Sequence, residues 1–374
     1  MFRFFYGVLG ALAVSILTFA VPQPAAAFDQ IFVFGDSTTD SGNVLIGSGG
    51  TTPDPDAFFQ GRFSNGPVWV DRLANALGVS LRPALAATDI TTQSLNFAFG
   101  GSQTGVSNFT PDGIFLVPGV NGQISGDPNN ALLPPSFSEL LANAGIGANP
   151  DALYVIWSGA NDFIIPPPNG LPPDVSAANI GNAITTLYGL GARHFLVNNL
   201  PDLGDTPLAQ LVGVDAQLSA ATAAYNGLLA LQLAALEAAL PDIDITTPNM
   251  NALIGTLLDY PNLFGFIDPA SQPAFGAGPA SGCLITTIFM TCELTEPDPA
   301  PGVFWYDEQH PSTTVHTWAG LGAFIALKCD RDDFRRRFRY IRCVARATRD
   351  YFGVNLMALA GKSQFVGQVL RSGN

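Results

Sequence analysis

A serine near the amino terminus is the residue of this sequence best placed for nucleophilic chemistry. Ser37 lies in the segment FGDSTTDSGN (residues 34–43), directly after residues 29–34, which are mostly apolar and rich in strand formers. A serine on the sharp turn that leaves a strand exposes its hydroxyl at the edge of a sheet, where a substrate can reach it. The same string also occurs as an ordinary turn. A catalytic role therefore requires a base, an orienting acid and oxyanion donors elsewhere in the chain.

Histidine is the usual base for activating a serine, and this chain has only 3 His residues. His310 follows Asp307 by three positions in VFWYDEQHPST (residues 303–313). This spacing lets one loop carry both groups, with Asp307 holding the proton on one imidazole nitrogen so that the other nitrogen faces the serine. A pair with this spacing also occurs on ordinary protein surfaces. We interpret His194, which opens a buried strand, and His316, which belongs to the next helix, as structural.

Acyl transfer also needs hydrogen-bond donors aimed at the developing oxyanion. Three predicted turns offer them: the backbone N–H of Ser37, the backbone N–H of Gly101 and the side-chain amide of Asn161. Gly101 follows an alternating segment at residues 94–99, and Asn161 follows an apolar segment at residues 151–157. An asparagine in such a turn also serves as a cap. The argument depends on all of these residues together.

The elements that position these residues alternate between strands and helices, which predicts a parallel sheet with both faces covered. In such sheets sites form at the carboxyl ends of the strands, where Ser37, Gly101 and Asn161 lie. We expect five strands, over residues 29–34, 94–99, 151–157, 194–199 and 243–247. We expect helices over residues 68–77, 136–143 (with Ser136 as N-cap), 175–190 and 206–240, with Gly213 as the site of a kink in the last.

These motifs together resemble the GDSL or SGNH hydrolases, specifically the larger secreted lipase/esterase branch that includes plant GDSL lipases and bacterial phospholipase or haemolysin relatives. Residues 34–43 resemble the first family block, although its usual Leu is Thr38 here. The segment GRFSNGPVW (residues 61–69) is similar to one distinctive of this branch. The remaining blocks resemble NFAFGGS (residues 96–102), GAND (residues 159–162) and DEQHP (residues 307–311).

The resemblance extends over residues 28–327 and implies a three-layer α/β/α, flavodoxin-like fold with a central parallel sheet of about five strands. It implies ester hydrolysis through an acyl-enzyme, without metal or cofactor. By block, Ser37, Asp307 and His310 would form the triad, and Ser37, Gly101 (rather than Gly100) and Asn161 would form the oxyanion hole. Two alternatives stay open: a carbohydrate acetylesterase of the same fold, or a secreted binding protein with a vestigial site.

Composition limits the partners that this chain can take. It has 374 residues, 47% of them hydrophobic, and a formal net charge of −14, which disfavours nucleic acid. We expect a monomer that acts on a small-molecule or lipid ester. The chain has 27 Phe, and several near the motifs could form either an apolar acyl pocket or ordinary core: Phe58, Phe59, Phe63, Phe109 and Phe163.

The amino terminus resembles a secretion signal. Arg3 supplies the positive start, residues 7–21 the apolar stretch, and residues 22–27 a small-residue cleavage region that ends in Ala-Ala-Ala. The alternative is a transmembrane anchor, which the prolines and the Ala-Ala-Ala disfavour. We therefore expect a mature chain that begins at Phe28 and is extracellular or periplasmic.

The 4 Cys residues fit such a compartment. Cys283 and Cys292 would close a small loop if oxidised, whereas the sequence does not settle the pairing of Cys329 and Cys343.

The last segment, residues 328–374, has a different composition from the rest. It holds eleven of the 16 Lys and Arg residues against four Asp, a net charge of +7, so that the rest of the chain carries −21. Its apolar residues suggest an amphipathic basic helix that contacts an anionic membrane, or a solvated appendage. The sequence thus divides into a signal peptide (1–27), a hydrolase domain (28–327) and a basic tail (328–374).

Overall fold

A single parallel sheet forms the centre of the protein. The computed structural model describes residues 28–110, 115–164, 169–266, 280, 283, 292, 294, 302–330, 333–334 and 337–353. The sheet has six strands in the order β2-β3-β1-β6-β7-β8, and every neighbouring pair is parallel. The strands are β1 (Ile31–Gly35), β2 (Leu81–Pro83), β3 (Ser94–Asn96), β6 (Leu153–Trp157), β7 (His194–Val197) and β8 (Asp244–Thr246).

The sequence predicts about five strands, and the sixth is β2. This strand is a three-residue edge strand that contains a proline, so it lacks the apolar run that marks its neighbours. The central strands β1 and β6 are buried along their whole length, as expected for a parallel sheet covered on both faces. On one face Phe32, Phe34 and Tyr154 pack around Phe137, with ring centroids 4.9–6.0 Å apart.

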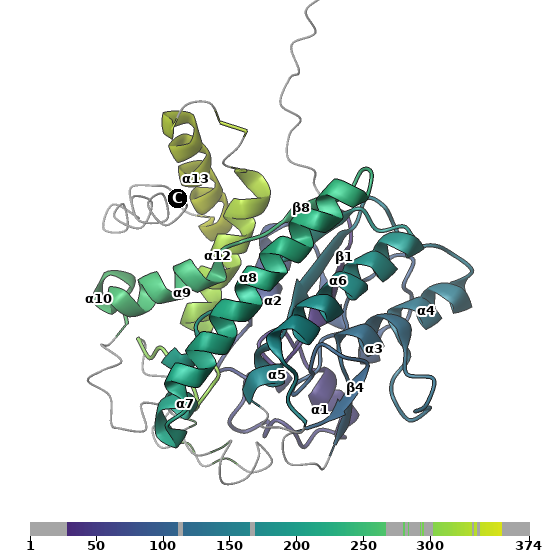
Figure 1. Cartoon of the computed structure of the whole chain (residues 1–374), viewed down its shortest axis with the longest axis horizontal. Coiled ribbons are helices and arrows are strands. Elements are labelled where there is room, and N and C mark those ends of the chain that lie inside the picture. The colour runs from purple at the N-terminus through teal and green to yellow at the C-terminus, as the bar shows by residue number, and fades with distance from the viewer. Residues whose placement is uncertain are drawn as a thin grey trace, which may run out of the picture.

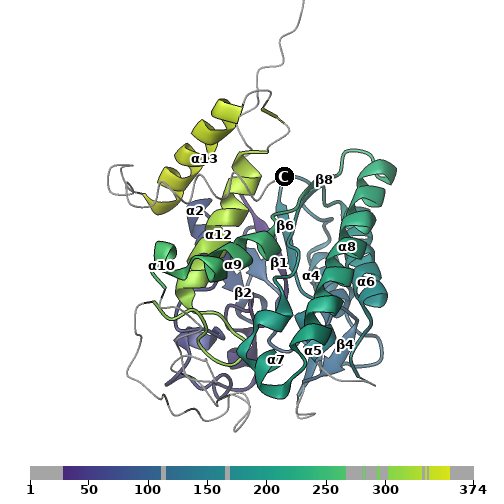
Figure 2. The same cartoon turned by 60° about the vertical axis from the view of Figure 1, so that its left-hand side comes forward.

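Two sets of helices cover the sheet, one on each face (Figures 1 and 2). The three-layer α/β/α architecture is therefore confirmed. One set comprises α3 (Val120–Ser125), α4 (Phe137–Ala144), α6 (Pro173–Leu190) and α8 (Asp215–Ala239). The other comprises α2 (Trp69–Ala76), α9 (Met250–Asp259), α12 (Thr313–Lys328) and α13 (Arg337–Phe352).

Several local predictions can be compared with these elements. Ser136 is the N-cap of α4 and forms a capping box with Glu139, as its position predicts. The expected helix over residues 206–240 is two helices, α7 (Pro207–Val212) and α8, because Gly213 adopts a left-handed φ of 72° that ends α7.

The stretch between residues 102 and 135 reads as loop from sequence. It contains α3 and an antiparallel hairpin of β4 (Ser107–Phe109) and β5 (Leu116–Pro118), whose strands are too short to show an alternating pattern. The short helices are α1 (Asn43–Gly47), α5 (Ala160–Ile164) and α10 (Pro261–Phe264), with single 3₁₀ turns at Phe59–Gly61, Ala84–Ala86 and Leu203–Asp205.

Both cysteine pairs are disulfide-bonded. Cys283 pairs with Cys292, as the sequence suggests, and Cys329 pairs with Cys343, which joins the end of α12 to α13. Among the described residues, none of the helices has both the length and the apolar character needed to cross a membrane. The predicted signal peptide at residues 1–27 lies outside the described part of the chain.

Candidate active site

The turn after β1 presents Ser37 at the carboxyl end of the sheet. The Asp36 carbonyl accepts hydrogen bonds from the backbone of Thr39 (3.0 Å) and Asp40 (2.9 Å), which closes the turn around Ser37. One oxygen of the Asp36 carboxyl group accepts from both the backbone and the hydroxyl of Thr38, at 3.1 and 2.8 Å. Thr38, at the position of the usual Leu, therefore adds a hydrogen bond inside the turn. Burial raises the pKa of Asp36 to about 6.

Ser37, His310 and Asp307 form a continuous chain of hydrogen bonds. The Ser37 Oγ lies 2.8 Å from His310 Nε2, and His310 Nδ1 lies 2.7 Å from Asp307 Oδ2. The other Asp307 oxygen accepts from the backbone N–H groups of Gln309 (2.8 Å) and His310 (2.7 Å). These two bonds explain the three-residue spacing, because they turn the loop so that both side chains point the same way. Ser37, His310 and Asp307 are all buried.

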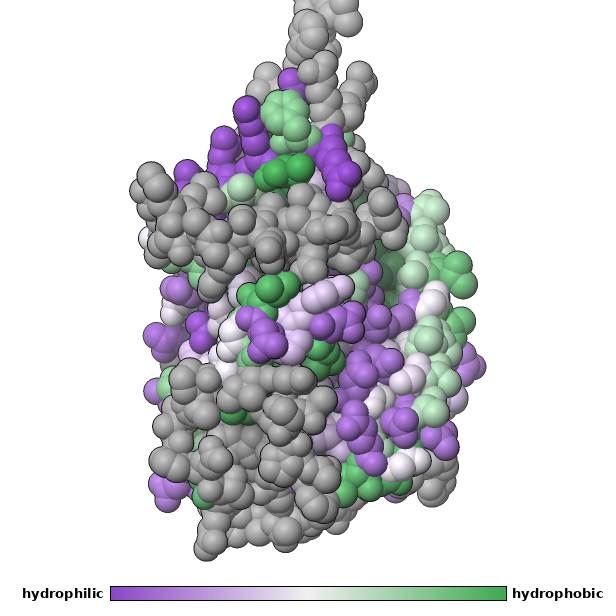
Figure 3. Space-filling model, turned by 90° about the vertical axis from the view of Figure 1, so that its left-hand side faces the viewer, coloured by the Kyte–Doolittle hydropathy of each residue, from purple (hydrophilic) through white to green (hydrophobic). Residues whose placement is uncertain are grey.

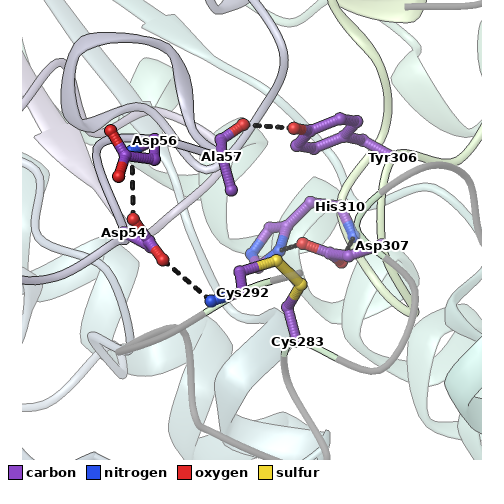
Figure 4. Close-up of a disulfide and its surroundings, with 8 residues drawn as sticks. All are labelled: Asp54, Asp56, Ala57, Cys283, Cys292, Tyr306, Asp307 and His310. Atoms are coloured by element: carbon purple, nitrogen blue, oxygen red, sulfur yellow. Dashed lines mark hydrogen bonds and ion pairs between the residues drawn. A yellow bond between two sulfur atoms is a disulfide. The ribbon is translucent and has the colours of Figure 1, made fainter. Parts of the chain in front are cut away.

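The loop that carries Asp307 and His310 is held at its base and on its flank. The Ser312 N–H donates to the Phe304 carbonyl and the Tyr306 N–H donates to the His310 carbonyl, both at 2.8 Å. The Tyr306 hydroxyl donates to the Ala57 carbonyl. Figure 4 shows the Cys283–Cys292 disulfide beside the Asp307–His310 pair.

The same disulfide is tied to the loop that follows α1. The backbone N–H of Cys292 donates to Asp54 at 2.8 Å, and Asp54 also accepts from the backbone of Asp56 at 3.0 Å (Figure 4). The bond between Cys292 and Asp54 joins two segments that lie 238 positions apart in the sequence.

The three expected oxyanion donors lie at the carboxyl ends of neighbouring strands. Gly101 has a φ of 81°, a left-handed conformation that glycine adopts without strain. Within the described residues, the backbone N–H groups of Ser37 and Gly101 donate to no protein acceptor. The buried Asn161 amide donates one hydrogen to the Ser102 carbonyl at 3.0 Å, and its second hydrogen has no acceptor among the residues that the structure describes.

Two buried carboxyl groups that the sequence analysis did not single out hold the Gly101 loop in place. Asp40 accepts from the Gly100 N–H at 3.1 Å and from the backbone of Gly42 and Asn43 at 2.7 Å. Burial raises the pKa of Asp40 to about 6 despite these bonds. The loop is thus tied to the turn that bears the serine.

Asp162 holds the far end of the same loop. It accepts from the backbone and the hydroxyl of Thr104, at 3.0 and 2.6 Å, and burial raises its pKa. Asp40 lies in the segment of residues 34–43, and Asp162 directly follows Asn161 in the segment of residues 159–162. Their places in these two motifs are the sequence signal that could have identified them.

An apolar pocket opens beside Ser37. Besides Ser37, Asn161 and His310, its apolar walls include Trp157, Ile164, Leu200, Leu203, Ile254, Phe304, Val315 and Ala319. His316 also lines the pocket; burial, then the nearby His310 and Arg72, lowers its pKa to about 3, so it is neutral.

None of the five phenylalanines that suggested an acyl pocket lines this cavity. Phe58 and Phe63 are buried in a smaller core cluster, and the ring of Phe163 packs against Tyr225. Phe59 and Phe109 are exposed. The core alternative therefore describes three of them. The pocket walls come instead from the end of β6 and from loops and helices, and no sequence pattern marked these residues as a pocket. In the part of the chain that the structure describes, no group of three or more His, Cys, Asp or Glu side chains could hold a metal ion.

The fold and these motifs agree with a comparison of the chain against known families. The model of the family described as GDSL-like Lipase/Acylhydrolase matches residues 31–321. The chain therefore belongs to the GDSL lipase/acylhydrolase family. The resemblance found in its sequence motifs is confirmed.

The chain is similar in sequence to several bacterial and plant proteins. It is 30% identical to a phosphatidylcholine-sterol acyltransferase of Aeromonas hydrophila, over 61% of this chain and 60% of that protein. It is 26% identical to the thermolabile hemolysin of Vibrio parahaemolyticus, over 78% of this chain and 62% of the other. A GDSL esterase/lipase of Arabidopsis thaliana is 27% identical, over 80% of this chain and 89% of that protein. The chain thus spans about three fifths of the length of the two bacterial relatives.

Proposed function

We propose that this protein cleaves carboxylic esters through an acyl-enzyme, with Ser37 as nucleophile, His310 as general base and Asp307 as the residue that orients it. The observation that supports this most directly is the hydrogen-bond chain from Ser37 Oγ through His310 to Asp307, at 2.8 and 2.7 Å. Nucleophile, base and orienting acid in contact are the arrangement that acyl transfer requires.

The steps follow from the positions of the protons. The Asp307 carboxylate accepts a hydrogen bond from the Nδ1–H of His310, which keeps the proton on Nδ1. Nε2 is therefore left to accept the proton of Ser37 as the serine oxygen attacks the ester carbonyl. When the tetrahedral intermediate collapses, the bond to the alcohol oxygen breaks and His310 returns the proton to that oxygen. Water then attacks the acyl-enzyme with His310 again as base, which releases the acid and restores Ser37.

The negative oxygen of the intermediate needs fixed donors. We assign this role to the N–H groups of Ser37 and Gly101 and to the second amide hydrogen of Asn161. In support, neither backbone N–H has another protein acceptor among the described residues, and Asn161 is held by its bond to the Ser102 carbonyl. Donors that are already fixed do not have to reorganise during the reaction.

The apolar pocket favours an acyl group longer than acetyl. Its walls are predominantly aliphatic and aromatic, and they begin at the residues that would flank the reacting carbonyl, Ser37 and Asn161. Burial of apolar chain contributes about 0.8 kcal/mol per methylene group, so such a pocket discriminates by chain length. This supports a lipid-like ester over an acetylated glycan.

We also propose that the protein is secreted, with residues 1–27 as the signal and residues 28–327 as the hydrolase domain. The two disulfides support an oxidising compartment.

The test is hydrolysis of p-nitrophenyl esters of increasing acyl length by residues 28–374, beside Ser37→Ala. We expect turnover that rises beyond the acetyl ester and falls by at least about 10⁴-fold in the variant. A serine-reactive fluorophosphonate should label the wild type and spare the variant. Full activity of Ser37→Ala would contradict the proposal. Acetyl-xylan is measured beside these esters, and faster hydrolysis of acetyl-xylan than of the longer esters would favour the acetylesterase. A folded protein that neither labels nor turns over any substrate would favour the binding protein.

A further inference from the structure

Helix α13 is fixed to the body of the protein along one face. Tyr340, Val344, Ala347 and Tyr351 recur at spacings of four, three and four residues, which places them on one side of a helix. Val344 and Ala347 are buried, and the two tyrosines are partly buried against the main core. The Tyr351 hydroxyl donates to the carbonyl of Thr317 on α12 at 3.1 Å. The disulfide between Cys329 and Cys343 fixes the middle of α13 to the end of α12.

The opposite face of α13 carries a row of arginines that we call the arginine stripe. It consists of Arg339, Arg342, Arg346 and Arg349, at spacings of three, four and three residues, and all four are exposed. Of these four arginines, only Arg349 forms an ion pair with another described residue, Asp350 at 2.7 Å. The stripe is therefore a positive surface held in a fixed direction.

An exposed aromatic ring lies beside the stripe. Phe338 is 47% exposed, and the guanidinium carbon of Arg342 lies 4.6 Å from its ring centroid. In Figure 3 hydrophilic side chains surround a few apolar ones at the end of the molecule that carries α13. An exposed aromatic residue next to several arginines is typical of a surface that meets both charged headgroups and the edge of an apolar phase.

The rest of the molecule has the opposite charge. Residues 328–374 carry +7 and the remainder of the chain −21. The family match ends at residue 321, so α13 lies beyond it. A negatively charged surface would attract the stripe and repel the remaining surface, which would orient the protein as well as bind it.

We propose that the arginine stripe and Phe338 bind the surface of an anionic phospholipid membrane. Arginine forms bidentate hydrogen bonds with lipid phosphates, and the Phe338 ring enters the boundary between headgroups and acyl chains. A bilayer fits this combination better than a soluble polyanion does, because a polyanion offers no apolar layer for the ring.

The proposal also fixes the direction of the active site. Figures 1 and 2 place α13 at the end of the molecule opposite α5 and α7, and Figure 1 places α1 near these two helices, around the carboxyl ends of the strands. A protein bound through α13 would therefore turn Ser37 away from the membrane. This consequence, unlike binding itself, rests on the proposed function: the tethered enzyme would hydrolyse esters outside the bilayer that holds it.

The test is cosedimentation of the protein with vesicles of phosphatidylcholine alone and of phosphatidylcholine with about 30 mol% phosphatidylglycerol. We expect binding to the anionic vesicles only, and a strong decrease as salt is raised from about 0.1 M to 1 M. Replacing Arg339, Arg342 and Arg346 together by Gln should weaken binding by about 100-fold, since each arginine near such a surface contributes about fivefold. Arg82→Gln, which removes one exposed charge from β2, is the control and should leave binding within twofold.

Two further variants distinguish this surface from others. Phe338→Ser should weaken vesicle binding, and a matched change at the exposed Phe109 of β4 should not. Equal binding to both vesicle types, unchanged binding by the triple variant, or loss of binding only in Phe109→Ser would overturn the proposal. So would equally tight binding to heparin that Phe338→Ser leaves unchanged, because it would show a polyanion site that needs no bilayer. Vesicle binding is measured without substrate, so it fails or succeeds independently of esterase activity.

Discussion

The two ends of this molecule use polar side chains in opposite ways. At the carboxyl end of the sheet, Ser37, Asp307 and His310 are buried, and two or more specific bonds fix each of Asp307 and His310. On α13 the arginines are exposed and repeat along one face. A buried polar group acts through its position, because an unsatisfied one is costly, whereas exposed charges act through their sum. Single conservative changes should therefore matter greatly at the first end and little at the second.

The largest expected effect comes from Asp307→Asn. An amide in place of the carboxylate can donate to Nδ1 and stabilise the wrong tautomer of His310, so kcat should fall by about 10⁴-fold. The matched control is Asp350→Asn, which makes the same chemical change on the exposed surface of α13 and should alter kcat by less than twofold. The measurement is steady-state kinetics with a p-nitrophenyl ester. Equal effects of the two variants would refute the contrast between the two ends.

Asn161→Ala should have the next largest effect. Loss of one fixed oxyanion donor lowers kcat by about 10²–10³-fold in comparable sites, with little change in KM. Steady-state kinetics at saturating ester measures this, with the melting temperature as a check that the variant folds. A loss below threefold would show that Asn161 only holds the Ser102 loop.

The buried carboxyl group of Asp40 should make stability depend on pH. Its native pKa of about 6 lies above the ordinary value of 3.8, so the folded protein binds this proton more tightly than the unfolded chain does. Protonation of Asp40 therefore contributes about 3 kcal/mol to the free energy of unfolding below pH 3.8, and this contribution is lost as the pH rises through about 6.

Denaturant unfolding of wild type and Asp40→Asn across this range measures the difference in the free energy of unfolding, which cancels the opposite contribution of His316. The advantage of the wild type should shrink as the pH rises. A difference that is flat with pH would show that Asp40 does not titrate in this way.

Removal of a disulfide should have the smallest effect on kcat. Because the protein has one disulfide near the active site and one at α13, this removal also gives the closest comparison between the two ends. The two disulfides close loops with sequence separations of 9 and 14 residues, so removing either should lower the free energy of unfolding by about 2.5–3 kcal/mol. The Cys283–Cys292 bond is drawn beside the Asp307–His310 pair in Figure 4, whereas the Cys329–Cys343 bond joins the end of α12 to α13. Replacement of Cys283 and Cys292 by two serines should therefore also lower kcat, by about tenfold or more.

The double replacement of Cys329 and Cys343 should leave kcat within twofold at temperatures where the protein stays folded. Both kcat and the melting temperature need to be measured on each variant. Loss of kcat in this second variant would show that α13 also supports the site.

Local sequence patterns were sufficient for much of the fold. The central strands β1 and β6 are apolar runs next to glycine-containing turns, and the Ser136 cap marks the start of α4. These elements could be predicted because their signals lie in neighbouring residues of the sequence. The expected helix over residues 206–240 was divided by Gly213. The edge strand β2 and the hairpin of β4 and β5 could not be predicted, since three-residue strands exist only through the partners that they pair with.

The sequence by itself singled out the residues to which we assign the chemistry. Ser37, Gly101, Asn161, Asp307 and His310 stand in recognisable segments in chain order. Only the tertiary structure decided that Ser37 and His310, 273 positions apart, lie within hydrogen-bond distance. It also decided which apolar side chains form a pocket and which fill the core, and that α13 turns its arginines outward. These outcomes depend on contacts between distant segments, and such contacts are set by the packing of the whole sheet and its helices rather than by any local pattern.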